Sequence, residues 1–348
     1  MTTESSQCQI EELSQPPVVC GMRLLDPSAS STAFPRRSFT TPNSMKDTVY
    51  HYTDANGLLG ILGKQEIWCS HLSYLNDTQE YRHAKMLYRD VLSTLKEDES
   101  AEQLVRRFAA QSLEYFDQKQ RAYDENTMWS IMLHPAKYFV ASFSGKNDEL
   151  SQWRGYSGTG PRFSIGFRTS EMERLDEMHA MSFGQVDYES ERASNTMRTK
   201  YLDHQSRLAR TFILSGRYTD PASIRQVEYT RVNDEILEPV APLLKHPKFA
   251  AEEEYRLHSN PSLGLGSPHS PFAVDFRPGR SFLIPYIKLP LENLDQPISS
   301  ITVGPTPHMN EAVTAVIALV NQVSKDRKSL FFGWQNLVGR SEIPYRDW

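Results

Sequence analysis

The 348-residue sequence predicts an α+β fold in a single domain over residues 46–348. Short apolar segments typical of strands alternate with segments whose apolar residues recur at helical spacing, and no internal repeat is present. Long helical segments interrupt the strand series. A chain of this length buries most of the apolar surface that its unfolded form exposes, so we expect a substantial hydrophobic core.

The first patterned stretch predicts a strand, a short helix and a second strand. The strands cover residues 49–52 and 67–72, and the side chain of Asp54 can cap the helix between them. Gly63 weakens the end of this helix. Its apolar residues expected on one face are Ala55, Leu58, Leu59 and Leu62.

The rest of the domain continues this alternation. A helix follows the cap-like Asp77-x-x-Glu80 spacing, and its core face carries Ala84, Leu87, Tyr88, Val91, Leu92 and Leu95. Further helices are predicted over residues 102–119, 191–214, 233–244 and 310–323. Further strands are predicted over residues 138–143, 162–167, 253–258, 272–276, 281–287 and 301–303.

Composition restricts the class of protein. With 39% hydrophobic and 23% charged residues and no apolar run of membrane-spanning length, we expect a cytoplasmic protein without a membrane partner. Three cysteines without metal-type spacing predict neither a disulfide framework nor a metal site. The net charge of −5 gives no overall attraction to nucleic acid. The basic segment 192–217 is a candidate nucleic-acid surface, although a solvated helix face explains it better.

Residues 1–45 are rich in serine, threonine and proline and lack the periodicity of a helix or strand. We expect them to form a disordered N-terminal extension. A translation start at Met45 would explain this composition equally well.

Two stretches carry more polar groups than packing requires. The segment 151–156 combines hydroxyls, an amide, a guanidinium and aromatic rings, which can bind ribose or phosphate and stack on a flat ring. Equally open is a structural role, with Trp153 in the core and Arg154 paired with a carboxylate. The second stretch, residues 252–254, consists of glutamates. If residues 253–258 form a strand, Glu252 and Glu254 share a face, and if they are buried their mutual repulsion would raise the proton affinity of one. A run of three glutamates is more often solvated on the surface, and we favour that interpretation.

Six ordered blocks resemble a bacterial family, domain of unknown function 2971 (DUF2971), over residues 48 to 346. The blocks are Tyr50-His51-Tyr52-Thr53; Ser73-Tyr74-Leu75-Asn76-Asp77 with Glu80; Leu150-Ser151-Gln152-Trp153-Arg154 with Tyr156; Phe249 with Glu252-x-Glu254-Tyr255-Arg256; Val303-Gly304-Pro305; and Ser341-x-Ile343-Pro344-Tyr345-Arg346.

The first block also resembles the start of the ADP-ribosyltransferase fold, as in DarT-type toxins and RNA 2′-phosphotransferases. That resemblance implies a split β-sheet core with helical insertions and NAD as substrate. It assigns His51 and Thr53 to NAD binding and Glu254 to catalysis, with Glu252 as the rival glutamate. Three residues are candidates for the central residue of the superfamily pattern: Ser70, Tyr74 and Tyr156. Further candidates for NAD binding are Ser151, Gln152, Trp153 and Arg154 of the third block, and Arg256.

The chemistry implied is cleavage of the bond between nicotinamide and ribose. Positive charge develops on the sugar, so a nearby carboxylate stabilises it, while a neutral histidine hydrogen-bonds the ribose. The acceptor would be a nucleic acid or a protein, and a toxin or phage-defence role with a neutralising partner follows by analogy. Two alternatives stay open: a noncatalytic nucleotide-binding or interaction module, and an NAD glycohydrolase. Arg256 could bind the pyrophosphate or hold the glutamates in place.

Overall fold

The computed structural model describes residues 46–75, 79–124, 138–155, 160–179, 181–215, 236–237, 240–259, 272–279, 281–326, 330–332 and 336–344. The predicted N-terminal extension, residues 1–45, lies outside these ranges. Residues 39–348 form one compact unit.

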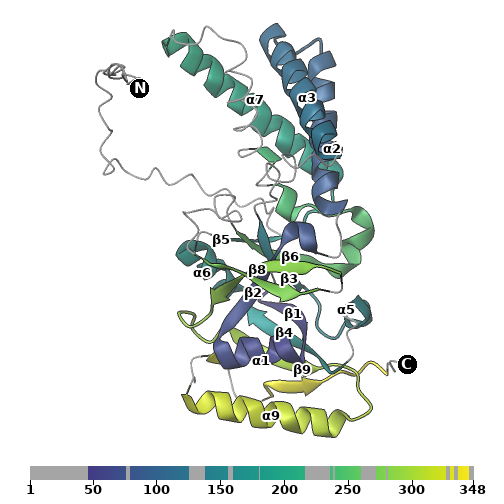
Figure 1. Ribbon diagram of the computed structural model, residues 1–348, viewed down its shortest axis with the longest axis vertical. Helices are drawn as coiled ribbons and strands as arrows, with labels where there is room; N and C mark the ends of the chain where they lie inside the picture. The colour runs from purple at the N-terminus through teal and green to yellow at the C-terminus, as the bar shows by residue number, and fades with distance from the viewer. Residues whose placement is uncertain are drawn as a thin grey trace, which may run out of the picture. The chain divides into compact units, whose positions relative to one another are not determined.

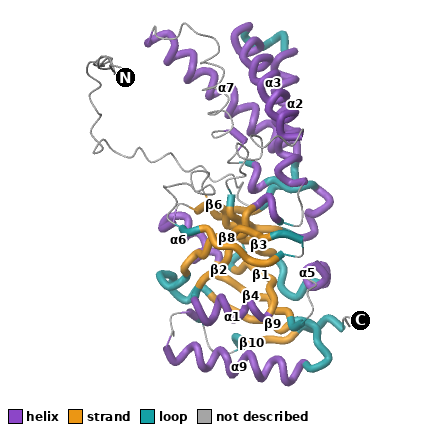
Figure 2. Tube along the Cα trace, viewed as in Figure 1, coloured by secondary structure: helices purple, strands orange, loops and turns teal. Residues whose placement is uncertain are grey.

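Ten strands of the described residues form one sheet, and the strands lie together in a single block (Figure 2). The sheet order is β10-β9-β4-β1-β3-β2-β8-β7, with β6 paired to β3 and β5 paired to β6. Of these strands, only β9 and β10 run parallel. The strands are β1 Thr48–Asp54, β2 Glu66–His71, β3 Phe139–Ser144, β4 Arg162–Arg168, β5 Met181–Gln185, β6 Glu254–Ser259, β7 Val274–Pro278, β8 Leu283–Pro290, β9 Ile298–Val303 and β10 Val338–Arg340.

The described helices, several of them labelled in Figure 1, accompany this sheet and confirm the α+β prediction. The α-helices are α1 Ala55–Lys64, α2 Gln79–Glu97, α3 Gln103–Asp124, α5 Leu150–Gly155, α6 Thr169–His179, α7 Ser190–Ser215 and α9 Met309–Asp326. Short 3-10 helices are η1 Leu72–Tyr74, η3 Ala241–Leu243 and η4 Pro247–Glu252. Of the helix predicted over 233–244, the described end is η3.

The sheet divides at β3. One edge of β3 is occupied by β6 from Val140 to Ser144. A strand has only two hydrogen-bonding edges, so β1 and β2 share the other edge. There β1 pairs with Ser144 and β2 pairs with Phe139 and Val140. The two strands therefore diverge from opposite ends of β3, and α1 connects them across the opening.

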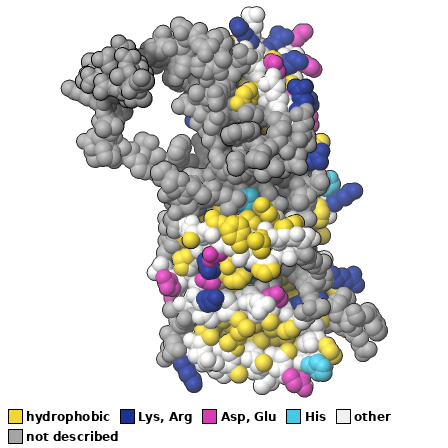
Figure 3. Space-filling view, in the orientation of Figure 1, with side chains coloured by type: hydrophobic (Ala, Val, Ile, Leu, Met, Phe, Trp, Pro, Cys, Tyr) yellow, Lys and Arg dark blue, Asp and Glu magenta, His cyan; other side chains and the backbone are white. Residues whose placement is uncertain are grey.

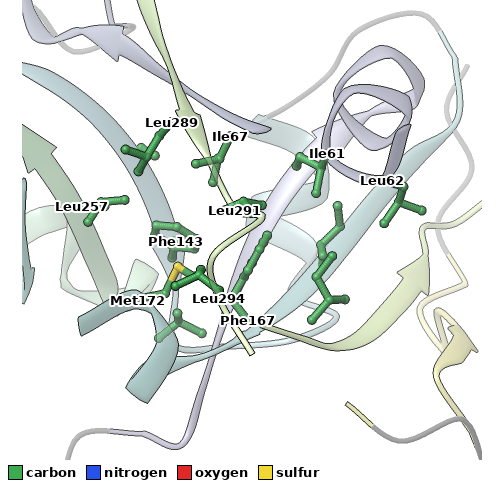
Figure 4. Packing of buried hydrophobic residues seen from close by; sticks show 14 of the residues in the cluster. Ile61, Leu62, Ile67, Phe143, Phe167, Met172, Leu257, Leu289, Leu291 and Leu294 are labelled. Atoms are coloured by element: carbon green, nitrogen blue, oxygen red, sulfur yellow. The ribbon is translucent and has the colours of Figure 1, made fainter. Parts of the chain in front are cut away.

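One face of the sheet carries the main hydrophobic core (Figure 4). Helices α1, α6 and α9 pack on the strands of this core, and α1 also contacts α9. Full burial of a large apolar side chain contributes about 1.5–3 kcal/mol, so this face supplies much of the stability. Figure 4 labels Ile61, Leu62, Ile67, Phe143, Phe167, Met172, Leu257, Leu289, Leu291 and Leu294 from this cluster.

A second hydrophobic cluster joins α2, α3, α7 and η3. Buried side chains recur along α2 at the spacing of one helix face, as predicted. These include Ala84, Tyr88, Val91, Leu92 and Leu95. Because η3 contacts both α2 and β6, this helical group is connected directly to the sheet.

Helix α1 follows its sequence signals with one correction. The Asp54 side chain accepts a hydrogen bond from the Gly57 amide, which caps the helix as predicted. The buried residues are Leu58, Ile61 and Leu62, whereas Leu59 is 53% exposed and was wrongly placed on the core face. At 100° per residue, Leu59 and Ile61 lie equally far from the line through Leu58 and Leu62, so helical spacing alone does not distinguish them.

Three elements gave little signal in the sequence. Among the described side chains of helix α6, the buried apolar ones are Met172 and Leu175, and few apolar residues mark its helical periodicity. Strand β5 has five residues and includes Gly184, and β10 has only three residues. All three are stabilised by neighbouring elements rather than by local propensity.

The close approach of Thr53 to Gly57 predicts a requirement for glycine. A Cβ at position 57 would lie 1.8 Å from Thr53 Oγ1, whereas nothing lies within 4 Å at Gly60. We expect Gly57→Ala to lower the free energy of unfolding by about 1–3 kcal/mol. In contrast, Gly60→Ala should raise it by up to about 1 kcal/mol through helix propensity. Urea unfolding measures both.

A double variant checks the cause. Thr53→Ala removes the clash, so Gly57→Ala should cost much less in that background. Equal effects of Gly57→Ala and Gly60→Ala in the native background would contradict the proposed contact.

Candidate nucleotide site at the split of the sheet

His51 occupies the split between β1 and β2. Its Nδ1 lies 2.9 Å from the carbonyl oxygen of Ser142, in the stretch of β3 between the positions paired with β1 and β2. The imidazole ring also contacts Phe143, with ring centroids 5.6 Å apart. The side chain thus satisfies a carbonyl that the divergence of the strands leaves without a strand partner.

This contact fixes the protonation of the ring. A carbonyl oxygen can only accept, so Nδ1 carries the hydrogen and donates it to Ser142. Burial lowers the pKa of His51, against a smaller raising effect of the Ser142 hydrogen bond, and favours the neutral imidazole. In the neutral ring Nε2 is an acceptor. Because His51 is only partly buried, this nitrogen is a candidate acceptor for a ligand hydroxyl.

Thr53 lies on the same face of β1 as His51, two residues along the strand. Its partner on β4 is Phe163, and that of His51 is Ile165. Both partners belong to the main core. Of the two residues assigned to NAD, Thr53 packs its hydroxyl toward Gly57, so His51 is the better placed for a ligand.

Glu254 lies on the opposite face of the sheet from His51. Strand register pairs Tyr50 with Ser144 and Ser144 with Glu254, which places these three side chains on one face. His51 follows Tyr50 and faces the other way, as its contact with Phe143 also shows. The structure therefore does not bring His51 and Glu254 into one cleft, contrary to the expected pairing.

Glu254 is held in a buried ion cluster. Arg256 donates to it through Nε at 2.7 Å and through its terminal nitrogen at 3.1 Å, and Lys245 Nζ donates at 2.9 Å. The three side chains are 1–9% exposed. Arg256 also donates to the Pro242 carbonyl in η3. The predicted alternative that Arg256 holds the glutamates is confirmed for Glu254, and its guanidinium is not available to a pyrophosphate.

The cluster reverses the expected direction of the Glu254 pKa. Burial alone raises this pKa, but the charges and hydrogen bonds of Arg256 and Lys245 outweigh it and lower the pKa to about 2. The sequence favoured solvated glutamates on a surface and predicted a raised proton affinity only for two buried together. The favoured prediction is wrong for Glu254, which is buried. Its proton affinity is lowered rather than raised because Lys245, which the sequence pattern did not include, joins the cluster from beyond η3.

The other two glutamates lie before the strand rather than in it. Glu253 has a left-handed backbone (φ 44°), so β6 begins at Glu254 and the strict alternation of faces does not extend to Glu252. Glu252 nevertheless shares Lys245 with Glu254, at 2.8 Å. Glu253 is more exposed and pairs with Lys46 and Lys146.

In helix α5, Trp153 is buried and its neighbours are exposed or half-buried. Trp153 is 1% exposed, packs against Tyr52 and donates from Nε1 to Asp148, so its role in the core is confirmed. Ser151 and Arg154 are exposed, and Gln152 is half-buried. Tyr156 lies outside the described residues.

Asp148 organises this region and was missed in the sequence. It accepts hydrogen bonds from Trp153 Nε1, the Ser341 hydroxyl and the Glu342 amide. It therefore ties α5 to the segment that follows β10. The signal that could have identified it is the Asn147-Asp148 pair in the turn after β3.

Ser70 and Tyr74 lie at the far side of the split. Ser70 pairs with Val140, is buried, and accepts a hydrogen bond from Arg277 at 3.0 Å. Tyr74 in η1 contacts the rings of His71 and Phe282. Neither residue is part of the Glu254 cluster.

Comparison with protein families gives one match. Residues 152–257 match DUF2971, described as a protein of unknown function. Over this region the chain is similar to DUF2971 proteins. The match runs from α5 to β6, so it covers part of the 48 to 346 range predicted. The DUF2971 region includes Trp153 and the Glu254 cluster but not His51. Searches of curated proteins and of solved structures found no match.

Two features are absent from the described residues. None of their helices has the length and apolar character needed to cross a membrane. Across the same ranges, no three histidine, cysteine, aspartate or glutamate side chains gather as metal ligands would. In the basic segment, three arginines of the described residues form ion pairs: Arg192 with Asp187, Arg198 with Asp98 and Arg207 with Asp203.

The ion cluster predicts unequal effects at neighbouring glutamates. We expect Glu254→Gln to lower the free energy of unfolding by about 3–5 kcal/mol, because Arg256 loses its buried carboxylate partner. The same change at the exposed Glu253 should cost less than about 1 kcal/mol. Urea unfolding of both variants tests this, and similar effects at the two positions would refute the structural role of Glu254.

His258 predicts a loss of stability in mild acid. Burial, with a smaller effect of the Arg256 charge, lowers its pKa to about 4. Below its ordinary pKa of 6.5 the unfolded chain binds a proton that the folded chain excludes, so stability falls as the pH drops from 6.5 to 4. The loss should reach about 3 kcal/mol.

Urea unfolding between about pH 7.5 and 4.5 measures that loss. His258→Gln should reduce the dependence of the unfolding free energy on pH but not abolish it, because the pKa of His51 is also lowered by burial and contributes to the same loss. The stabilising contribution of the Glu254 charge is lost only below about pH 4.5, so it does not enter this window. An unchanged slope in His258→Gln would contradict the assignment.

Proposed function

We propose that this chain binds NAD at the split of the sheet, with His51 recognising the nicotinamide-side ribose. One observation carries the proposal: the Nδ1–H of His51 is committed to the Ser142 carbonyl, which leaves Nε2 of a neutral ring as an acceptor. A ribose hydroxyl is a donor of matching chemistry. The resemblance of the first block to ADP-ribosyltransferases supports NAD as the nucleotide.

The division of the sheet at β3 supports the finer fold assignment as a proposal. Two strands that leave a third from opposite ends of one edge make a split core, which is the arrangement that the resemblance implies. We propose that this core is ADP-ribosyltransferase-like, with α2, α3 and α7 as helical insertions.

ADP-ribosyl transfer to a nucleic acid or protein is the second candidate, favoured by the resemblance of the first sequence block to ADP-ribosyltransferases. The oxygens of Glu254 already accept hydrogen bonds from Lys245 and Arg256, so in that case Glu254 is a structural residue. A different carboxylate then stabilises the positive charge that develops on the ribose. NAD hydrolysis without an acceptor also requires a carboxylate other than Glu254. Binding is thus the step that the geometry supports best, and a toxin or phage-defence role with a neutralising partner belongs to the transfer proposal.

The test uses a variant that keeps the split intact. Asparagine at position 51 retains an N–H donor for the Ser142 carbonyl but lacks the imidazole Nε2. We expect titration calorimetry to show NAD binding by the native protein and at least about tenfold weaker binding by His51→Asn, the equivalent of one lost hydrogen bond between neutral groups. The control is His308→Ala, because that histidine is exposed and remote in sequence.

Nicotinamide release and mass spectrometry of adducts separate the candidates. Release with covalent ADP-ribose on RNA, DNA or protein indicates transfer, and release without an adduct indicates hydrolysis. Binding without release indicates a noncatalytic module. If the native protein binds no NAD, or if His51→Asn binds it normally, the proposal is wrong.

A further inference from the structure

Strand β7 forms one end of the sheet. In the part of the chain that the structure describes, it pairs with β8 and with no other strand. Its second edge therefore presents backbone N–H and C=O groups that another strand could pair with. Proteins usually protect such an edge by covering it or by pairing it.

The two faces of this hairpin differ in chemistry. Phe276 and Leu283 are 60% and 62% exposed, and the register places both on one face. Asp275 and Arg277 lie on the other face, one residue to each side of Phe276. In Figure 3, hydrophobic side chains gather on the visible surface at the level of β8.

The charges of β7 are complementary to those of a second, antiparallel copy of β7. If two copies of β7 run antiparallel about a twofold axis through Phe276, Asp275 of each copy lies opposite Arg277 of the other. The two Phe276 rings then meet on the other face, each next to a Leu283. Like charges would be opposed if the register slipped by two residues, so this pattern also fixes the register.

We propose that the chain forms a twofold homodimer by antiparallel pairing of β7 with β7 of a second copy. The interface continues the sheet across the axis and buries the exposed Phe276 and Leu283 side chains. Asp275 and Arg277 are both partly buried, and each exchanges its partner within the chain for one across the axis when the dimer forms. Within the chain Asp275 pairs with Lys288, whose side chain is 41% exposed, and Arg277 donates to Ser70.

The second copy fits this edge better than an unrelated strand does. An unrelated antiparallel partner would need an aspartate followed two residues later by an arginine, the order found in β7, whereas a second copy supplies both by symmetry. Cross-strand aromatic and opposite-charge pairs are the main stabilising units of antiparallel pairing. Two such charge pairs and one aromatic pair form in a single step.

The experiment exchanges charges between copies. Asp275→Arg places arginine opposite arginine in its own dimer, and Arg277→Asp places aspartate opposite aspartate. Each variant alone should dimerise about tenfold or more weakly than the native chain by analytical ultracentrifugation. Mixed in equal amounts, the two variants should form a heterodimer, because both arginines of one β7 strand then face the two aspartates of the other.

Controls separate the interface from the fold. Phe276→Ser should also weaken the dimer, whereas Leu59→Ser, at an exposed leucine of α1, should not. Melting temperatures of all variants identify any that fail to fold. A native chain that stays monomeric at high concentration would overturn the proposal. So would a native dimer whose single variants dimerise normally or whose mixture does not associate.

Discussion

A strand has two hydrogen-bonding edges, and β3 uses them for three partner strands. β6 occupies one edge fully, so β1 and β2 share the other and must diverge. The divergence creates the opening that α1 spans, and it leaves the Ser142 carbonyl to be satisfied by His51. The position, tautomer and accessible nitrogen of this histidine all follow from that constraint.

The opposite face of the same strands has a different chemistry. There Glu254 pairs with Lys245 and Arg256, and Lys245 also pairs with Glu252, in a cluster that connects β6 to η3, and η3 in turn contacts α2. Removing one member would leave a buried charge without its partner, which is costly in a medium of low polarity. The cluster therefore stabilises the junction between the sheet and the helical group.

These two faces separate recognition from catalysis in the proposed function. A transferase glutamate must approach the ribose that the histidine holds, yet β3 lies between His51 and Glu254. The family match over residues 152–257 includes the ion cluster and most of α5. Both contribute to stability: Trp153 packs in the core, and Asp148, just outside the match, ties α5 to the segment after β10.

The sequence by itself determined the local elements of this protein. Caps and apolar spacing predicted β1, α1, β2, β4, β6 and α9 closely, because these signals act within a few residues. His51 was likewise placed correctly, in a strand before a capped helix. The partner and the face of each side chain were decided only by the tertiary structure. Register between distant strands placed Glu254 behind the sheet, and Lys245 reached it through a turn that no local pattern encodes.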